Sequence, residues 1–420
     1  MSQVHDMQED GMKVEVANTG ARRSVPLWRN RDYILLWSGQ MVSSVGTFVS
    51  QLAFPLLVLA LTHSPAQAGL VAALRGLPFA LFILPAGALV DRWNRKRVMI
   101  LCDSGRAIAL GSIPAVLLLG HLTIMQLYIV ALVEGTLFTF FNLAETACLP
   151  QVVSKDQLTA VVAQNSVIDS VAGMLGPSFG GILYSIGRAV PFLTDTISYI
   201  VSVLSLFFIK AQFQEERSVE PLHLWKEIGE GLSWLWHHPV MRFIALLTCG
   251  LILPVSGYGL IIIVLAQMQH ATSFEIGLIL AASGVGSIVG AMIVAPLRRR
   301  FSFGKMMIGS TWLWVSTWLL FAVAPNPLLL GVATALSFIV VPMYMSLQFG
   351  YRLSIIPDHL QGRVNSVFRL IAFGSEPIGL ALTGFLIQLI GPVHTVLLLF
   401  VPQLVCAIVA TFSKHFRDTK

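Results

Sequence analysis

Charged residues are scarce in this sequence, where they occupy 11% of 420 positions. A soluble chain is normally about a quarter charged, so this composition excludes an ordinary soluble protein. Cysteine is scarce as well, and no two cysteines form a CxxC pair. Because Cys102, Cys148, Cys249 and Cys406 all lie far apart in apolar stretches, we expect neither a disulfide nor a metal site.

The sequence also lacks the motifs of nucleotide-driven pumps and of common hydrolases. It contains no G-x-x-x-x-G-K-[ST] phosphate-binding loop, no H-E-x-x-H pair and no G-x-S-x-G turn. We therefore expect no enzyme activity and no cofactor. If the protein moves a substrate against a gradient, an ion gradient must supply the energy.

Apolar stretches of about 20 residues are abundant, and each can cross about 30 Å of hydrocarbon as a helix. Hydrophobic residues make up 55% of the chain. The alternating pattern of a β-barrel is absent, so helices are the spanning structure that satisfies the backbone. The sequence predicts an all-α membrane protein with twelve transmembrane helices. These helices are expected at 32–61, 67–90, 98–119, 124–148, 158–186, 189–210, 240–268, 275–297, 304–323, 326–350, 362–390 and 393–413.

The positions of the cations predict the orientation of these helices. Nearly all of the 27 Lys and Arg residues fall in the two tails or in the loops on the same side as the tails. Arg188 is the one cation in a loop of the opposite side. We expect a multi-pass protein of the plasma (inner) membrane. By the positive-inside rule, both of its termini are cytoplasmic. The net charge of +6 then reflects topology and contact with anionic lipid, and it indicates no nucleic-acid partner.

The longest segment between apolar stretches divides the predicted helices into two sets of six. Within it Leu224, Ile228, Leu232 and Leu235 recur at helical spacing, which predicts an amphipathic helix on the cytoplasmic face or a plain helical linker. The expected organisation is a polar tail without a signal peptide (1–30), a six-helix bundle (31–210), the linker (211–239), a second six-helix bundle (240–413) and a C-terminal tail (414–420).

The two bundles share weak internal repeats. A shift of 208 residues places Gly69 on Gly277, and a shift of 200 residues places Pro177 on Pro377. The matches keep their order and fall at equivalent helices. Tandem six-helix halves related by pseudo-symmetry are a transporter architecture.

The stretch GALVDRWNRKRVM, residues 87–99, lies between the second and third apolar stretches and contains four cations and a single acid. It resembles the loop 2–3 signature of the major facilitator superfamily, G-x-L-x-D-R-x-x-R-K. The matching positions are Gly87, Leu89, Asp91, Arg92, Arg95 and Lys96. The resemblance covers residues 31–413, and the segments LPQVV and PFLTDTISY are similar to the branch of macrolide efflux pumps and enterobactin-type siderophore exporters.

The resemblance implies that this motif acts as a conformational gate. In the superfamily the acid, here Asp91, contacts the start of helix 11, here near 362–363, when the protein is open to the outside. Gly87 is expected to let helix 2 approach a neighbour closely. The cations can instead be simple topology anchors. Span 4 lacks the arginine that often supports the acid, so Arg106 or Arg363 is expected to take its place.

Four glycines and a proline are concentrated in the segment GMLGPSFGG of span 5. They resemble the antiporter motif of exporters in the superfamily and are Gly173, Gly176, Pro177, Gly180 and Gly181. Small residues permit near-contact between helices, and a proline bends the span. The resemblance favours export, and plain helix packing is the alternative.

Few ionisable residues lie within the apolar stretches, where each is costly unless it is paired or hydrated. The candidates for proton coupling, in order, are Glu134, Asp169 and Glu376, with Arg75 and Arg369 as counter-ions. Arg75 and Glu134 share a depth, and a shift of 200 residues places Asp169 on Arg369. A structural ion pair is the alternative for each. Asp103, Arg106 and Asp195 are expected to be structural.

Polar and aromatic residues recur in spans 1, 4, 7 and 10, which line the central cavity in the superfamily. The expected substrate contacts are Gln40, Ser44, Thr47, Gln51, Phe138, Phe141, Asn142, Tyr258, Gln267, Tyr344 and Gln348. In span 1 they follow helical spacing and share one face. Hydrogen bonding between helices is the alternative. A cavity of aromatic and uncharged polar groups suits amphipathic or hydrophobic small molecules.

Together these features predict a monomeric secondary active transporter that exports small molecules of the drug, macrolide or siderophore class by alternating access. Proton coupling is expected, with sodium as the alternative ion. Two other functions stay open, namely a metabolite uniporter or importer and a non-transporting membrane scaffold on the same fold.

Overall fold

The computed structural model describes residues 26–90, 92–211, 213, 224–357 and 360–413. The first half contains η1 (Leu27–Arg29), α1 (Arg31–Thr62), α2 (Pro65–Val90), α3 (Arg95–Leu118), α4 (Ile124–Val152), η2 (Lys155–Gln157), α5 (Leu158–Ile186) and α6 (Val190–Phe208). A separate helix, α7 (Leu224–His237), lies in the linker. The second half contains α8 (Pro239–Val255), α9 (Tyr258–Met268), α10 (Ser273–Arg298), α11 (Phe303–Trp318), α12 (Leu320–Val323), α13 (Pro327–Ile355), α14 (Gln361–Phe373) and α15 (Glu376–Phe412).

The described helices account for the predicted number of membrane crossings. Eleven segments are long and apolar enough to span a bilayer, and the last of them, Gln361–Phe412, has 52 residues. At 1.5 Å per residue it would extend about 78 Å, more than twice the thickness of a hydrocarbon core. Gly391, with φ 77° and ψ 165°, breaks α15 inside this segment, so the segment crosses twice. The predicted all-α fold with twelve spans is confirmed for the described chain.

Polar side chains fix where several helices begin. Asn94 accepts a backbone hydrogen bond at 3.1 Å at the start of α3, and Asn326 accepts one at 2.9 Å at the start of α13. Thr272 and Glu275 form a reciprocal capping box at the start of α10. These side chains satisfy backbone N–H groups that have no partner within the helix, so the sequence itself specifies these helix starts.

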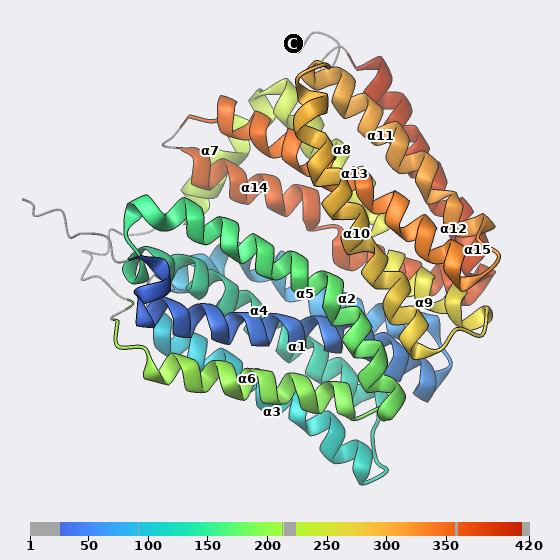
Figure 1. Ribbon diagram of the computed structural model, residues 1–420. Coiled ribbons are helices and arrows are strands. Elements are labelled where there is room, and N and C mark those ends of the chain that lie inside the picture. Colours follow the sequence, from blue (N-terminus) through green and yellow to red (C-terminus); the bar gives the residue numbers. More distant parts are fainter. Residues whose placement is uncertain (1–25, 91, 212, 214–223, 358–359, 414–420) are drawn as a thin grey trace, which may run out of the picture.

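The two halves lie side by side, with α1–α6 grouped apart from α8–α15 (Figure 1). We call the side of the bundle that carries η1, α7 and the end of α15 the terminal side. The opposite side, with the turns at 62–65 and 268–273, is the far side. Because α7 packs against α14 and α8, the linker helix is attached to the second half.

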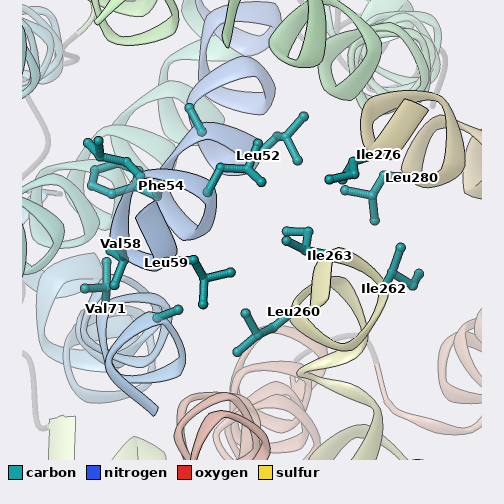
Figure 2. Close-up of a cluster of buried hydrophobic side chains, with 14 of the residues drawn as sticks. Leu52, Phe54, Val58, Leu59, Val71, Leu260, Ile262, Ile263, Ile276 and Leu280 are labelled. Atoms are coloured by element: carbon teal, nitrogen blue, oxygen red, sulfur yellow. The ribbon is translucent and has the colours of Figure 1, made fainter. Parts of the chain in front are cut away.

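The largest core cluster joins the two halves at the far side. It combines Leu52 and Val58 of α1 with Leu260 and Ile263 of α9 and Ile276 of α10 (Figure 2). Two further clusters of buried residues lie nearer the terminal side, and each of them belongs to one half. Within the described residues, the apolar core therefore holds the halves together at the far side and not at the terminal side.

Glycines allow two close helix contacts between the halves, which we call the two seams. In the first seam α2 meets α15, and a Cβ added at Gly69 would lie 2.8 Å from Gly384 Cα. In the second seam α5 meets α10, and a Cβ added at Gly277 would lie 3.1 Å from Ser178 Cα. Gly69 and Gly277 are the residues that the shift of 208 positions superimposes, so the internal repeat corresponds to two equivalent packing sites.

The second seam provides a test of this packing. In Gly277→Val the new side chain meets the backbone of Pro177 and Ser178, which cannot move aside as a flexible side chain can. Overpacking of this kind costs about 1–3 kcal/mol, so we expect a lower thermal unfolding temperature in detergent. The control is Gly309→Val, because no atom of the described chain lies within 4 Å of a Cβ at that position. Equal unfolding temperatures for the two variants would contradict the described seam.

Candidate functional site

Four charged side chains from three helices lie paired inside the first half, and we call them the buried charge cluster. Arg75 of α2 forms an ion pair with Glu134 of α4 through Nε, and its Nη2 donates to Glu134 Oε1 at 3.2 Å. Arg106 of α3 donates to the same oxygen at 3.0 Å and to Asp103 Oδ1 at 3.3 Å. Glu134 is 1% exposed and Arg106 is 2% exposed. The cluster therefore balances two guanidinium groups with two carboxylates, and of the four side chains only that of Arg75 is partly exposed.

A glycine explains how α2 and α4 come close enough to form this cluster. A Cβ added at Gly135 would lie 2.8 Å from the carbonyl carbon of Arg75 and 3.1 Å from its Cα. Such an approach requires a residue without a side chain. The backbone of α4 therefore passes directly beside Arg75 and holds Glu134 within reach of the guanidinium group.

Hydroxyl groups from α1 and α6 complete the surroundings of the cluster. Arg106 Nη2 donates to Tyr199 Oη, and the Arg106 Cζ atom lies 4.0 Å from the centroid of the Tyr199 ring. Tyr199 Oη lies 2.9 Å from Thr47 Oγ1. Ser202 Oγ donates to Asp103 Oδ2 at 2.6 Å. The cluster thus connects five helices of the first half, namely α1, α2, α3, α4 and α6.

A third carboxylate lies beside the cluster. Asp195 is fully buried one turn before Tyr199 on α6, and Ser198 Oγ donates to its Oδ1 at 3.1 Å. Asp195 interacts electrostatically with Arg106 and Glu134. Glu145 of α4 also interacts electrostatically with Asp103 and Arg106. Within the described part of the first half, this region therefore holds more acids than arginines, and protons bound to the acids would balance the charges.

This arrangement can couple protonation to helix packing. An unpaired charge inside a membrane protein is costly, and pairing offsets much of that cost. A change in the protonation of one acid changes how many ion pairs connect α2, α3 and α4. Among the described residues, no group of three or more His, Cys, Asp or Glu side chains has a geometry suited to a metal ion.

The other predicted coupling residues lie apart from the cluster. Asp169 of α5, Arg369 of α14 and Glu376 of α15 are exposed, and none of the ion pairs between described residues includes them. Arg369 lies over Phe79 of α2, with its Cζ atom 5.5 Å from the ring centroid. The prediction that Arg369 is a paired counter-ion is therefore wrong for this conformation. The coupling roles of Asp169 and Glu376 stay predictions.

Four predicted substrate contacts point into the helix bundles. Phe141 packs in the core of the first half, and Tyr344 Oη lies 2.8 Å from Thr248 Oγ1 in the core of the second half. Gln348 is 2% exposed, and Thr47 is bonded to Tyr199 beside the buried charge cluster. The assignments of Phe141, Tyr344 and Thr47 are corrected for this conformation, because these side chains are engaged with neighbouring helices. Gln348 has a buried Oε1 atom without a partner among the described residues, so its contact with a ligand stays a prediction.

The remaining cavity candidates are exposed or partly exposed, and they are Gln40, Ser44, Gln51, Phe138, Asn142, Tyr258 and Gln267. Phe138 lies over Arg106, with the Cζ atom 5.3 Å from the ring centroid. The Tyr258 ring packs against Phe338 with a centroid distance of 4.9 Å. Gln267 lies at the far-side end of α9. Their contacts with a substrate stay predictions.

The gate motif is described only in part, because Asp91 lies outside the described residues. Among the described residues, nothing lies within 4 Å of a Cβ added at Gly87, and the side chains of Leu89 and Arg92 are exposed. The predicted close approach of helix 2 at Gly87 is therefore wrong for this conformation. The physical reason is that the two halves are not packed together at the terminal side, where Gly87 lies.

Two cations of the motif make specific contacts within the first half. Arg95 Nη1 donates to the carbonyl oxygen of Ala147 at 2.8 Å and to Gln151 Oε1 at 3.1 Å, both on α4. Lys96 Nζ donates to the carbonyl oxygen of Ile209 at 2.6 Å, just after α6. These bonds connect the start of α3 to the ends of α4 and α6, so Arg95 and Lys96 do more than anchor the topology.

The two arginines expected to support Asp91 have other partners. Arg363 of α14 forms ion pairs with Glu230 and, at 3.7 Å, with Glu227, both on α7. Arg106 belongs to the buried charge cluster. Because Asp91 lies outside the described residues, its support by Arg106 or Arg363 stays a prediction, and the start of α14 is attached to the linker helix in this conformation.

The glycines of the span 5 motif make the expected near-contacts with two helices. A Cβ added at Gly176 would lie 3.3 Å from the backbone of α1, and Gly173 and Gly180 also face α1. Gly181 faces α10 of the second half, where an added Cβ would lie 3.0 Å from a Cα atom. Pro177 lies between these glycines within α5 and contributes its carbonyl group to the second seam. The role of the motif in export stays a prediction.

The sequence alone does not indicate a role for Tyr199 or a link between Arg106 and Glu134. The available signal is the spacing of the polar residues. Asp103 and Arg106 are three residues apart on α3, and Asp195 and Tyr199 are four apart on α6, so each pair shares a helix face. Two such faces inside an apolar bundle indicate a buried polar cluster.

Comparison with known proteins places the chain among membrane transporters. The sequence profile of a family described as transmembrane secretion effector matches residues 24–420. The chain is 27% identical over 399 residues to the multidrug efflux pump Tap of Mycolicibacterium fortuitum, covering 92% of this chain and 96% of that protein. It is 26% identical over 358 residues to the enterobactin exporter EntS of Citrobacter koseri, covering 84% and 85% of the two chains.

A solved structure shows the same fold. A bacterial homologue of the iron transporter ferroportin, in an inward-facing state, matches with a TM-score of 0.73 at 15% sequence identity. The match covers 92% of this chain and 99% of that chain. The protein is thus a multi-pass membrane transporter of small molecules, and it is not an enzyme.

The hydroxyl group of Tyr199 gives a test of the buried charge cluster. In Tyr199→Phe, Arg106 loses an acceptor, and the loss of a hydrogen bond to a charged group costs about 1.5–3 kcal/mol. We expect equilibrium unfolding in detergent micelles to show this loss. The control is Tyr184→Phe, because the Tyr184 hydroxyl is buried without a hydrogen-bond partner among the described residues. If both variants lose the same stability, Tyr199 does not support the cluster.

Proposed function

The chain belongs to the transmembrane secretion effector family of the major facilitator superfamily, and we propose that it exports amphipathic or hydrophobic small molecules. The observation that carries this proposal is the similarity to the multidrug efflux pump Tap along 92% of the chain. The similarity to the enterobactin exporter EntS supports the same direction of transport. Both relatives move molecules outward according to their names, and neither name indicates uptake.

The packing of the halves supports transport by alternating access. The cations of the tails and adjoining loops put the terminal side in the cytoplasm by the positive-inside rule. In that orientation the halves are joined on the outer side by the shared core and the two seams. This conformation corresponds to an inward-open transporter that is ready to receive its substrate from the cytoplasm.

An apolar groove supports the proposed class of substrate. It lies along the first seam between α2 and α15 and is lined by Leu70, Leu77, Pro377 and Phe385, among other apolar side chains. A groove of this kind within the span of the bilayer admits a hydrophobic molecule and offers few partners to a sugar or a phosphate.

Proton coupling is assigned to the buried charge cluster. Glu134 is shared by Arg75 and Arg106, so its charge controls contacts of α2, α3 and α4 together. Asp195 supplies an additional acid that can hold a proton beside the cluster. A proton that enters from outside would rearrange these pairs and change the packing of the first half against the second.

Purified protein in liposomes with an imposed proton gradient tests this function. The flux of fluorescent amphipathic dyes, both cationic and anionic, is followed while protons flow in the opposite direction. We expect driven dye flux for the wild-type protein and loss of most of it in Glu134→Gln, because the neutral amide cannot form the two ion pairs. The matched control is Glu275→Gln, an acid at the far side whose side chain bonds to Thr272.

Each other result has a defined meaning in this assay. Normal driven flux in Glu134→Gln would remove Glu134 from the coupling mechanism. Dye equilibration that is independent of the proton gradient would indicate a passive carrier. The absence of flux for every dye with folded wild-type protein would contradict export of this class of molecule.

A further inference from the structure

The second half contains a buried cation for which the described structure shows no acidic partner. Arg352 of α13 is 6% exposed, and its Nε and Nη1 atoms have no hydrogen-bond partner among the described residues. The ion pairs described in the second half are those of Arg363 with Glu227 and Glu230. Because an unpaired buried charge is costly, such an arginine calls for a ligand.

Aromatic rings hold this guanidinium group in place. The Arg352 Cζ atom lies 4.1 Å from the centroid of the Phe368 ring and 5.4 Å from that of Phe349. Phe368 is fully buried in the core of the second half, so the ring is a fixed support. Stacking uses the flat face of a guanidinium group and leaves the N–H groups at its edge free for an acceptor.

Two amide side chains, one a turn from Arg352 and the other a turn from Phe368, also have buried hydrogen-bonding atoms without a partner among the described residues. Gln348 lies one turn before Arg352 on the same face of α13, and its Oε1 atom is buried without a partner among the described residues. Asn365 lies one turn before Phe368 on α14, and its Oδ1 atom is also unpartnered. A side-chain amide can present either its oxygen or its N–H groups to a ligand.

A second arginine, Arg369, directly follows Phe368, the residue whose ring supports the Arg352 guanidinium group. The charge of Arg369 interacts unfavourably with that of Arg352. Two neighbouring cations raise the energy of the folded state unless an anion lies between them. The positions of Arg352 and Arg369 therefore favour a ligand with negative charge.

We propose that Arg352 and Arg369, together with Gln348 and Asn365, form a site for an oxyanion, a carboxylate or a phosphate attached to an apolar body. The guanidinium edge of Arg352 would bind the oxygens as a fork, and the apolar body would rest on the neighbouring phenylalanines. Two sources have this chemistry, the acidic group of a transported molecule and the headgroup of an anionic lipid. This inference goes beyond the proposed function, because the site can bind an anion whether or not the protein transports that anion.

The test is a titration of the purified full chain in phosphatidylcholine nanodiscs with benzoate, followed by thermal unfolding. We expect benzoate to raise the unfolding temperature of the wild-type protein in a saturable way. In Arg352→Gln the apparent Kd should rise by about tenfold or more, the change expected when a hydrogen bond to a charged group is lost. Arg352→Lys keeps the charge without the fork, and it should also bind more weakly than the wild-type protein.

The matched control is Arg242→Gln. Arg242 is another arginine of the second half that lies over an aromatic ring, with its Cζ atom 5.5 Å from the Trp236 centroid, but it already donates to a carbonyl oxygen. This variant should respond to benzoate as the wild-type protein does. Equal benzoate responses in Arg352→Gln and the wild-type protein, or no response of the wild-type protein, would overturn the proposal.

A second titration in phosphatidylglycerol nanodiscs distinguishes the two sources. If the lipid headgroup occupies the site, the wild-type protein should be more stable there, and its response to benzoate should vanish. If the site receives the acidic group of a transported molecule, the response should persist in both lipids. A failure of proton-driven dye flux would leave these binding results unchanged, so the two proposals can fail separately.

Discussion

The cost of placing a charge away from water controls the structure of the first half. Glu134 is buried, and it is tolerated because guanidinium groups from two other helices share its carboxylate. The same requirement brings Tyr199 to Arg106 and Ser202 to Asp103. Five helices are therefore held together by polar contacts in a place where the surrounding lipid gives no hydrophobic force to join them. Any change in the charge of the cluster must alter how these helices pack.

The contacts between the halves differ at the two ends of the molecule. At the far side, a shared apolar core and two glycine seams bring the backbones together. At the terminal side each half has its own core, and Arg363 is engaged by the linker helix α7. Opening the far side would separate the contacts at Gly69 and Gly277, which are short and local, and would also expose the shared apolar core at a cost in free energy.

Much of the fold could be predicted because hydropathy reports the length of each crossing directly. The pair of Arg75 and Glu134 could be predicted as well, since both residues lie at one depth on helices that run in the same direction. The pairing of Glu134 with Arg106 could not be predicted. Side-chain packing sets the rotation of α3 about its axis, and the spacing of residues in the sequence does not reveal that rotation. For the same reason Phe141 and Tyr344 were wrongly predicted to contact the substrate, whereas both side chains are buried within the helix bundles. The double crossing at the C-terminus was predicted from length, whereas the direct joining of both helices at Gly391 depends on a single backbone conformation.

The uneven distribution of buried charge shows how far the two repeats have diverged. The first repeat pairs its arginines with its own carboxylates, and the second keeps Arg352 buried with unused donor atoms. The two halves therefore differ in how they accommodate buried charge, although the internal repeat relates their helices. The repeat preserves the arrangement of the helices, whereas the buried charged residues that supply the chemistry differ between the two halves.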